Sequence, residues 1–286
     1  MPKILRFTFR VLRDFFLKNH GLLLTAAVAF NMMLSLIPLS ALLIVIVSHF
    51  FDEALLLETL TAEIALIAPG FTPILTDVLS GFLGTRSLIT WVGLGSLLVF
   101  SSFAFRVLEH AISIIFHAPL PALKRKFWVS VLMPYLFILI VAGGLILVTT
   151  VNAVIDVQSR TQHSVFGMQL SLHQHFGHIV YLTGLLGLVL LFTLFYQIMP
   201  VAKVSFRLAL AGGLTATLLW ELVRHLVVSY YAHFSMVNVV YGSMATIIIV
   251  LLTLEAVALI LLLGAQVIAD LHRSATAGVP WYEDPD

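Results

Sequence analysis

Six stretches of this sequence are apolar enough and long enough to cross a lipid bilayer as helices. They cover residues 22–51, 88–116, 127–155, 178–200, 208–231 and 244–269, and a spanning helix needs about 20 predominantly apolar residues. The composition agrees, because 60% of the residues are hydrophobic and only 10% are charged, whereas soluble domains carry about 25% charged residues. The sequence therefore predicts an all-α, polytopic membrane protein with a bundle of six transmembrane helices.

The distribution of Lys and Arg predicts how these spans are oriented. Of the 15 basic residues, eleven lie before the first span, between the second and third, between the fourth and fifth, or after the sixth. Because cytoplasmic segments of membrane proteins carry an excess of Lys and Arg, we expect these segments and both chain ends in the cytoplasm. The membrane domain then covers residues 21–272, and residues 273–286 form a cytoplasmic tail.

Residues 1–20 have the pattern of an amphipathic helix. At 100° per residue, five basic side chains share one side of the helix and apolar side chains cover the other. We interpret this segment as an interfacial helix on an anionic inner leaflet, the alternative being an ordinary basic flank that is merely helical. The five basic residues are Lys3, Arg6, Arg10, Arg13 and Lys18.

The connection over residues 52–87 faces outward under this topology. Its apolar runs are interrupted by Pro69, Gly70 and Pro73, which favours two short helices resting on the outer membrane face over a free loop. These helices could form a gate over a cavity or a structural cap, and both interpretations stay open.

Two spans carry ionisable side chains grouped at helical spacing. Such residues are costly at membrane depth and usually face the bundle interior, where they mark substrate pathways or structural pairs. Each group places an Arg three residues from a Glu, so that the two charges can neutralise each other on one helix. The groups are Arg106, Glu109 and His110 in the second span and Glu221, Arg224 and His225 in the fifth.

Glu255 in the sixth span has no basic residue within one helical turn. Either desolvation keeps it protonated, or it shares Arg106 or Arg224 across helices. A connected network through the membrane midplane would suit transport or a proton relay, whereas isolated salt bridges would only hold the bundle together. The residues leave this choice open.

The first span places Asn31, Ser35 and Pro38 on one helix face through their spacing of four and three residues. Pro38 removes a hydrogen bond from the helix and frees a backbone carbonyl. A kinked helix with an inward Asn suits a substrate site, and it suits helix packing equally well.

Sequence signatures of soluble enzymes are absent. The chain has no cysteine, which excludes Cys-ligated zinc and iron–sulfur clusters, and it has no zinc-protease, nucleophile-elbow, P-loop or dinucleotide-binding motif. Its formal net charge of +1 does not suit a strongly basic nucleic-acid binder. We therefore expect a protein that is not an enzyme and has no metal, no cofactor and no nucleic-acid partner.

Several strings resemble the YihY/BrkB family of bacterial inner-membrane proteins. They are AAVAFNMMLSLIPL in the first span, AGGLTATLLWELVRHLVVSYYAHF in the fifth, and VYGSMATIIIVLL followed by LLLGAQ in the sixth. The resemblance implies a six-span helical fold in the inner membrane, with cytoplasmic termini and an activity that is poorly settled. The chain departs from the family pattern at Ser113, Thr253, Glu255 and Gln266, so a role of Glu255 would be particular to this branch.

The resemblance also bears on function, because family members have been linked to serum resistance and to handling of envelope lipids. A "ribonuclease BN" label carried by some members finds no support in these residues, since the sequence offers neither a metal site in water nor a basic RNA groove. We favour a transporter or flippase-like protein for an amphiphile, an envelope lipid or a small solute. The alternative is a non-transporting scaffold that anchors partner proteins, and the expected partners are membrane lipids and a second copy of the chain.

Overall fold

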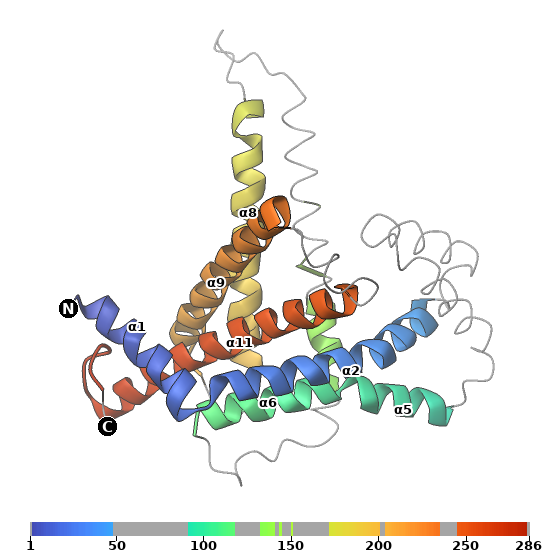
Figure 1. Cartoon of the computed structure of the whole chain (residues 1–286), viewed down its shortest axis with the longest axis horizontal. Coiled ribbons are helices and arrows are strands. Elements are labelled where there is room, and N and C mark those ends of the chain that lie inside the picture. The colour runs from blue at the N-terminus through green and yellow to red at the C-terminus, as the bar shows by residue number, and fades with distance from the viewer. Residues whose placement is uncertain are drawn as a thin grey trace.

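The computed structural model describes residues 2–47, 91–117, 132–140, 143–144, 150, 172–200, 204–234 and 245–284. These residues form helices and no strands (Figure 1). The helices are α1 (Lys3–Arg13), a π-helical turn η1 (Asp14–Lys18), α2 (Gly21–Val47), α5 (Trp91–Ser101), α6 (Phe103–Ile115), α8 (Leu172–Ile198), α9 (Phe206–Phe234) and α11 (Ala245–Ala277). Residues 132–140 form a further helical segment.

Four helical stretches in this part of the chain are long and apolar enough to cross a membrane. They are Gly95–Ile115, Tyr181–Ile198, Phe206–Leu226 and Val250–Ala277, and a bent pair formed by Lys3–Lys18 and Gly21–Leu36 raises the count to five. A helical membrane protein is thereby confirmed at the level of its class. The count of six spans stays a prediction, because most of the predicted third span, 127–155, lies outside the described residues. The predicted outward-facing helices of 52–87 also lie outside them.

The chain bends sharply where α1 and η1 meet α2. The axes of the two arms differ by 70°, and His20 between them has a positive φ of 49°. Gly21 is required at this corner, because a Cβ there would lie 2.5 Å from Cδ1 of the buried Phe15 ring. The bend therefore separates a charged helix from the apolar span.

The second span is interrupted at Ser102, between α5 and α6. Ser101 Oγ donates to the Leu98 carbonyl at 3.1 Å and Ser102 Oγ donates to the Val99 carbonyl at 2.7 Å. Serine hydroxyls that bond to the preceding turn bend helices, which accounts for the break.

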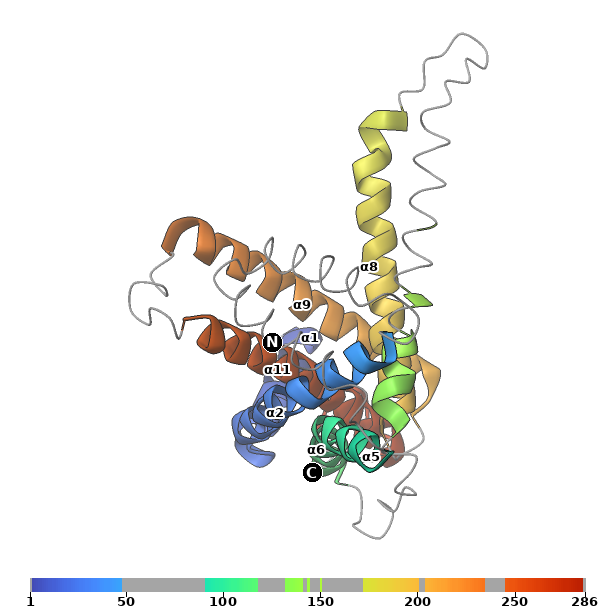
Figure 2. The same ribbon diagram turned by 90° about the vertical axis from the view of Figure 1, so that its right-hand side faces the viewer.

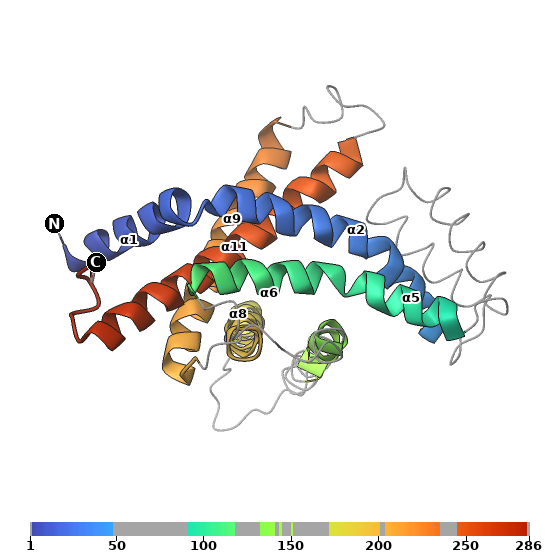
Figure 3. The same ribbon diagram turned by 90° about the horizontal axis from the view of Figure 1, so that it is seen from below.

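The core forms where the helix ends next to the basic connections converge. Buried apolar residues come from the start of α2, the end of α6, the end of α8, the start of α9 and the second half of α11. Helices α2, α6 and α11 run side by side, whereas α8 crosses their direction (Figures 1 and 3). The core therefore joins one end or half of each of these five helices.

Two glycines let α8, α9 and α11 approach closely. Figure 2 shows α9 meeting the lower part of α8. A Cβ on Gly213 of α9 would lie 2.9 Å from the backbone nitrogen of Thr193 in α8, and a Cβ on Gly264 of α11 would lie 3.2 Å from the carbonyl oxygen of Gly212. Tyr196, fully buried, donates to the Leu261 carbonyl at 2.9 Å. The small residues of the fifth span therefore serve backbone packing.

Candidate functional site

A polar cluster lies between α8 and α9, within two of the candidate spans. Glu221 accepts a hydrogen bond from Arg224 Nη2 at 2.7 Å and one from the Tyr181 hydroxyl at 3.1 Å. His225 Nε2 lies 3.8 Å from the same carboxylate oxygen. The ion pair that the spacing of the fifth span predicts is therefore formed, and Tyr181 adds a contact from the next helix.

The exposure of this cluster decides what it can do. The Glu221 side chain is 19% exposed, whereas the side chains of Arg224 and His225 are 46% and 72% exposed. The guanidinium carbon of Arg224 also lies 5.9 Å from the centre of the Tyr181 ring. The ion-paired guanidinium of Arg224 and the imidazole of His225 are therefore accessible from outside the protein.

Arg106 lies in α6 just after the break at Ser102. Its Nη2 is 3.4 Å from Ser102 Oγ, and its guanidinium carbon is 4.6 Å from the centre of the Phe103 ring. Arg106 and Glu109 are half-buried, whereas His110 is exposed. The three ionisable side chains that the sequence groups in the second span are therefore not equally exposed, and His110 points away from the other helices more than Arg106 and Glu109 do.

The polar residues of the first span bond mainly within their own helix. Asn31 Nδ2 donates to the Ala27 carbonyl at 2.8 Å, and Ser35 Oγ donates to the Asn31 carbonyl at 2.5 Å. The buried Ser35 hydroxyl also accepts a hydrogen bond from the Ala104 backbone nitrogen at 3.2 Å, which ties α2 to the start of α6. Pro38 lies inside α2 without ending it. These contacts give Ser35 a role in packing α2 against α6.

Glu255 is half-buried on α11. Across the part of the chain that the structure describes, its carboxylate makes no hydrogen bond and no ion pair, so neither Arg106 nor Arg224 pairs with it there. Its role therefore stays a prediction from the sequence.

A buried polar network that the sequence did not single out joins η1 to the end of α11. Asn19 Nδ2 donates to Gln266 Oε1 at 2.8 Å, and Gln266 Nε2 donates to Asp270 Oδ1 at 2.9 Å. Asp270 also forms an ion pair with Arg273. Gln266 and Asp270 are four residues apart on one helix face, which is the signal in the sequence that could have indicated the network.

Asp14 is the second buried carboxylate of this region, and its side chain is 2% exposed. Three cations surround it, with nitrogen–oxygen distances of 2.8 Å to Arg13, 3.6 Å to Lys18 and 3.7 Å to Arg273. Hydrogen bonds from Arg13 to Asp284 and Asp14 raise the pKa of the Arg13 guanidinium above its ordinary value. The guanidinium therefore stays charged at every physiological pH.

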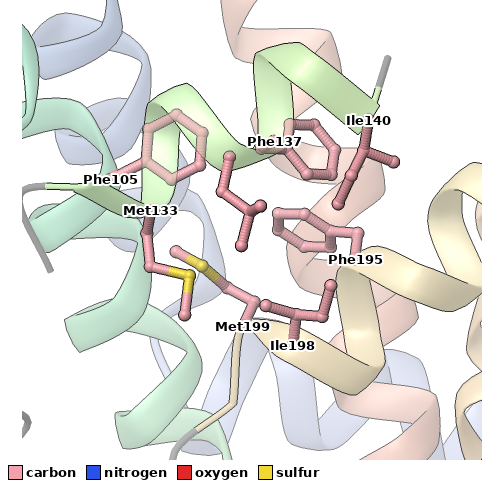
Figure 4. A pocket seen from close by; sticks show the side chains of 8 residues that line it. Phe105, Met133, Phe137, Ile140, Phe195, Ile198 and Met199 are labelled. Carbon is pink, nitrogen blue, oxygen red and sulfur yellow. The ribbon is translucent and has the colours of Figure 1, made fainter. Parts of the chain in front are cut away.

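An apolar pocket lies between α6, the helical segment 132–140 and the end of α8 (Figure 4). Its walls carry no charged side chain, and its volume of about 10 Å³ leaves room for no more than a water-sized group. The lining residues are Phe105, Met133, Leu136, Phe137, Ile140, Phe195, Ile198 and Met199. Within the described ranges, no group of three His, Asp or Glu side chains is placed to hold a metal ion.

Comparison with known proteins identifies relatives over nearly the whole chain. The sequence model of the family described as Virulence factor BrkB matches residues 13–283. A UPF0761 membrane protein of Azotobacter vinelandii is 27% identical over 93% of this chain and 63% of its own length. One from Pseudoalteromonas translucida is 27% identical, covering 89% and 82%, and one from Rhodospirillum centenum is 29% identical, covering 90% and 55%. The chain thus spans less than two thirds of two of these relatives, and no solved structure matches it.

Proposed function

Since the chain belongs to the Virulence factor BrkB family of membrane proteins, we propose that it moves an amphiphile across the bacterial inner membrane. In this proposal both ends of the chain are cytoplasmic, and the cluster of Tyr181, Glu221, Arg224 and His225 holds the polar headgroup. The substrate class is an envelope lipid or a related small solute with an anionic or zwitterionic head.

One observation carries this proposal, namely that the Arg224 side chain is 46% exposed on a helix stretch apolar enough to cross a membrane. A charged side chain at membrane depth is costly unless it faces water, a polar partner or the bundle interior. Glu221 accepts a hydrogen bond from Nη2 of the guanidinium at 2.7 Å, and within the described residues its Nε and Nη1 groups donate to no acceptor. A phosphate or carboxylate headgroup would satisfy them, because guanidinium binds such groups through two parallel hydrogen bonds.

Exposed leucine side chains flank the cluster on both helices and favour an amphiphile over a purely polar solute. Leu182 on α8 and Leu222 on α9 are both exposed, so the polar cluster lies within an otherwise apolar surface. An amphiphile would meet both kinds of surface there. The apolar pocket near the end of α8 has a volume of only about 10 Å³, which is too small for an acyl chain.

The test is lipid movement in liposomes that contain the purified full chain and fluorescent phospholipid analogues. A membrane-impermeant reductant quenches only the outer leaflet, so the slow quenching phase reports movement between leaflets. We expect faster movement of anionic or zwitterionic analogues than in empty liposomes. Arg224→Gln should slow it about tenfold or more, because a hydrogen bond to a charged group contributes about 1.5–3 kcal/mol.

Arg207→Gln is the matched control, since Arg207 lies on the same helix, is exposed and makes no ion pair within the described part of the chain. It should leave the rate unchanged. If the protein accelerates no analogue, the transport role fails and the alternative of a scaffold for partner proteins is favoured. Equal rates for wild type and Arg224→Gln would keep transport but reject the headgroup site.

A further inference from the structure

The amphipathic helix α1 presents its apolar face to the surroundings. Ile4 is 72% exposed, Phe9 is 68% exposed and Leu12 is 40% exposed, whereas Arg10 is only 5% exposed. Exposed Leu22 and Leu23 continue the apolar surface onto the first turn of α2. An apolar face that joins a membrane span through a 70° bend is positioned to lie in the membrane interface.

The basic face of α1 is turned toward the chain's own tail. Arg10 donates to the carbonyls of Trp281 at 3.2 Å and Asp270 at 3.3 Å, to Ser274 Oγ at 3.1 Å, and to the Glu283 carbonyl. The expectation that all five basic residues face lipid headgroups is therefore wrong for Arg10. Because three of its acceptors are backbone carbonyls, this part of the contact does not depend on tail side chains.

Contacts of two aromatic rings in the same tail also join it to the first turns of α1. The rings of Phe7 and Trp281 meet edge to face with centroids 5.5 Å apart, and Lys3 Nζ lies 4.9 Å from the centre of the Tyr282 ring. Figure 1 shows the two ends of the chain side by side at this point. Residues 281–284 thus form a cover over the polar side of α1, which we call the tail latch.

An exposed ion pair lies at the outer edge of the tail latch. Arg13 Nη2 lies 2.5 Å from Asp284 Oδ2, and the two side chains are 37% and 31% exposed. Exposed ion pairs are weak and are screened by salt. Arg6 on the same helix is exposed and, within the described residues, contacts no acidic group of the tail.

We propose that anionic lipid headgroups of the adjoining leaflet compete with Asp284 for Arg13, so that α1 is a lipid-docking surface whose engagement weakens the tail latch and raises the fraction of molecules in which it is open. A phosphodiester offers the guanidinium two oxygens, as the Asp284 carboxylate does. The negative potential of an anionic leaflet attracts juxtamembrane basic side chains. Arg6, which contacts no acidic group of the tail within the described residues, adds attraction toward the lipid. This inference does not depend on the proposed transport function.

The experiment measures the distance between α1 and the tail in nanodiscs. The chain has no cysteine, so Thr8→Cys and Glu283→Cys, both at exposed positions, can carry two spin labels for pulsed electron paramagnetic resonance. In pure phosphatidylcholine we expect one short distance population. With half of the lipid replaced by phosphatidylglycerol, a second, longer population should appear.

Two variants with opposite expected effects make the test specific. Asp284→Asn should increase the longer population several-fold, because it removes the competing carboxylate. Arg6→Gln should decrease it, because it removes lipid attraction and leaves the latch intact. Inorganic phosphate added to phosphatidylcholine discs should change nothing, since the proposed ligand is the lipid surface. The proposal would be overturned if wild type and Asp284→Asn each gave the same distance distribution in both lipid compositions. It would also be overturned if the longer population were as large in pure phosphatidylcholine as in the mixture with phosphatidylglycerol.

Discussion

The side-chain amide of Asn19 donates a hydrogen bond of 2.8 Å to the side-chain carbonyl of Gln266, across 247 residues of sequence. Both residues are buried, with 6% and 0% exposure. Gln266 in turn donates a hydrogen bond from its Nε2 to Asp270 Oδ1. The contact therefore links the corner before α2 to the second half of α11, and it makes the two ends of the chain one structural unit.

Replacing Gln266 with Leu should destabilise the protein by about 1–3 kcal/mol, because buried donors and acceptors left unsatisfied lose about that much. Asn19 would lose its acceptor and Asp270 would lose a donor. Thermal unfolding in detergent measures the effect. Thr276→Val on the exposed face of α11 is the control and should be nearly neutral, and equal melting temperatures for the two variants would contradict a stabilising network.

Gly213→Ala should destabilise the packing of α8 on α9 by about 1–3 kcal/mol, the typical cost of overpacking. The added Cβ would lie 2.9 Å from the backbone nitrogen of Thr193, so the helices must move apart. Gly184→Ala on α8 is the matched control, because nothing lies within 4 Å of its Cβ position. There the better helix propensity of Ala should stabilise by up to about 1 kcal/mol. Similar changes in melting temperature for both variants would argue against the tight crossing.

The topology can be tested by single cysteines, since the natural chain has none. We expect His173→Cys, near the start of α8, to react with an impermeant thiol reagent added outside the inner membrane. Thr276→Cys near the end of α11 should react only after the membrane is opened. The opposite pattern would place the ends of the chain outside the cytoplasm.

Glu255→Gln tests whether Glu255, which has no ion pair or hydrogen bond among the described residues, has a functional role. Gln is nearly isosteric and cannot ionise, so folding and membrane abundance should be unchanged. If Glu255 takes up and releases a proton during transport, lipid movement in liposomes should fall about tenfold or more, a change of about 1.4 kcal/mol in the barrier. Full activity would remove Glu255 from the mechanism, and loss of abundance would make it structural.

Much of the helix content followed from local properties of the sequence. Long apolar runs predicted the helical stretches now seen as α2, α8, α9 and α11, because a backbone in lipid must satisfy its hydrogen bonds within one segment. The spacing of Glu221 and Arg224 predicted their ion pair for a similar reason, since residues three apart on a helix are neighbours whatever surrounds them.

The contacts between helices were decided by the tertiary structure alone. Tyr181 reaches Glu221 from another helix, and Arg10 bonds to carbonyls 260 to 273 residues away. A charge pattern read along one helix showed Arg10 as one of five basic residues, equally suited to lipid headgroups. Helical periodicity specifies which side chains share a face, but only the packing of distant segments determines what that face meets. Hence the sequence determined the membrane helices and the local ion pair, and the tertiary structure determined that the basic face of α1 binds the tail.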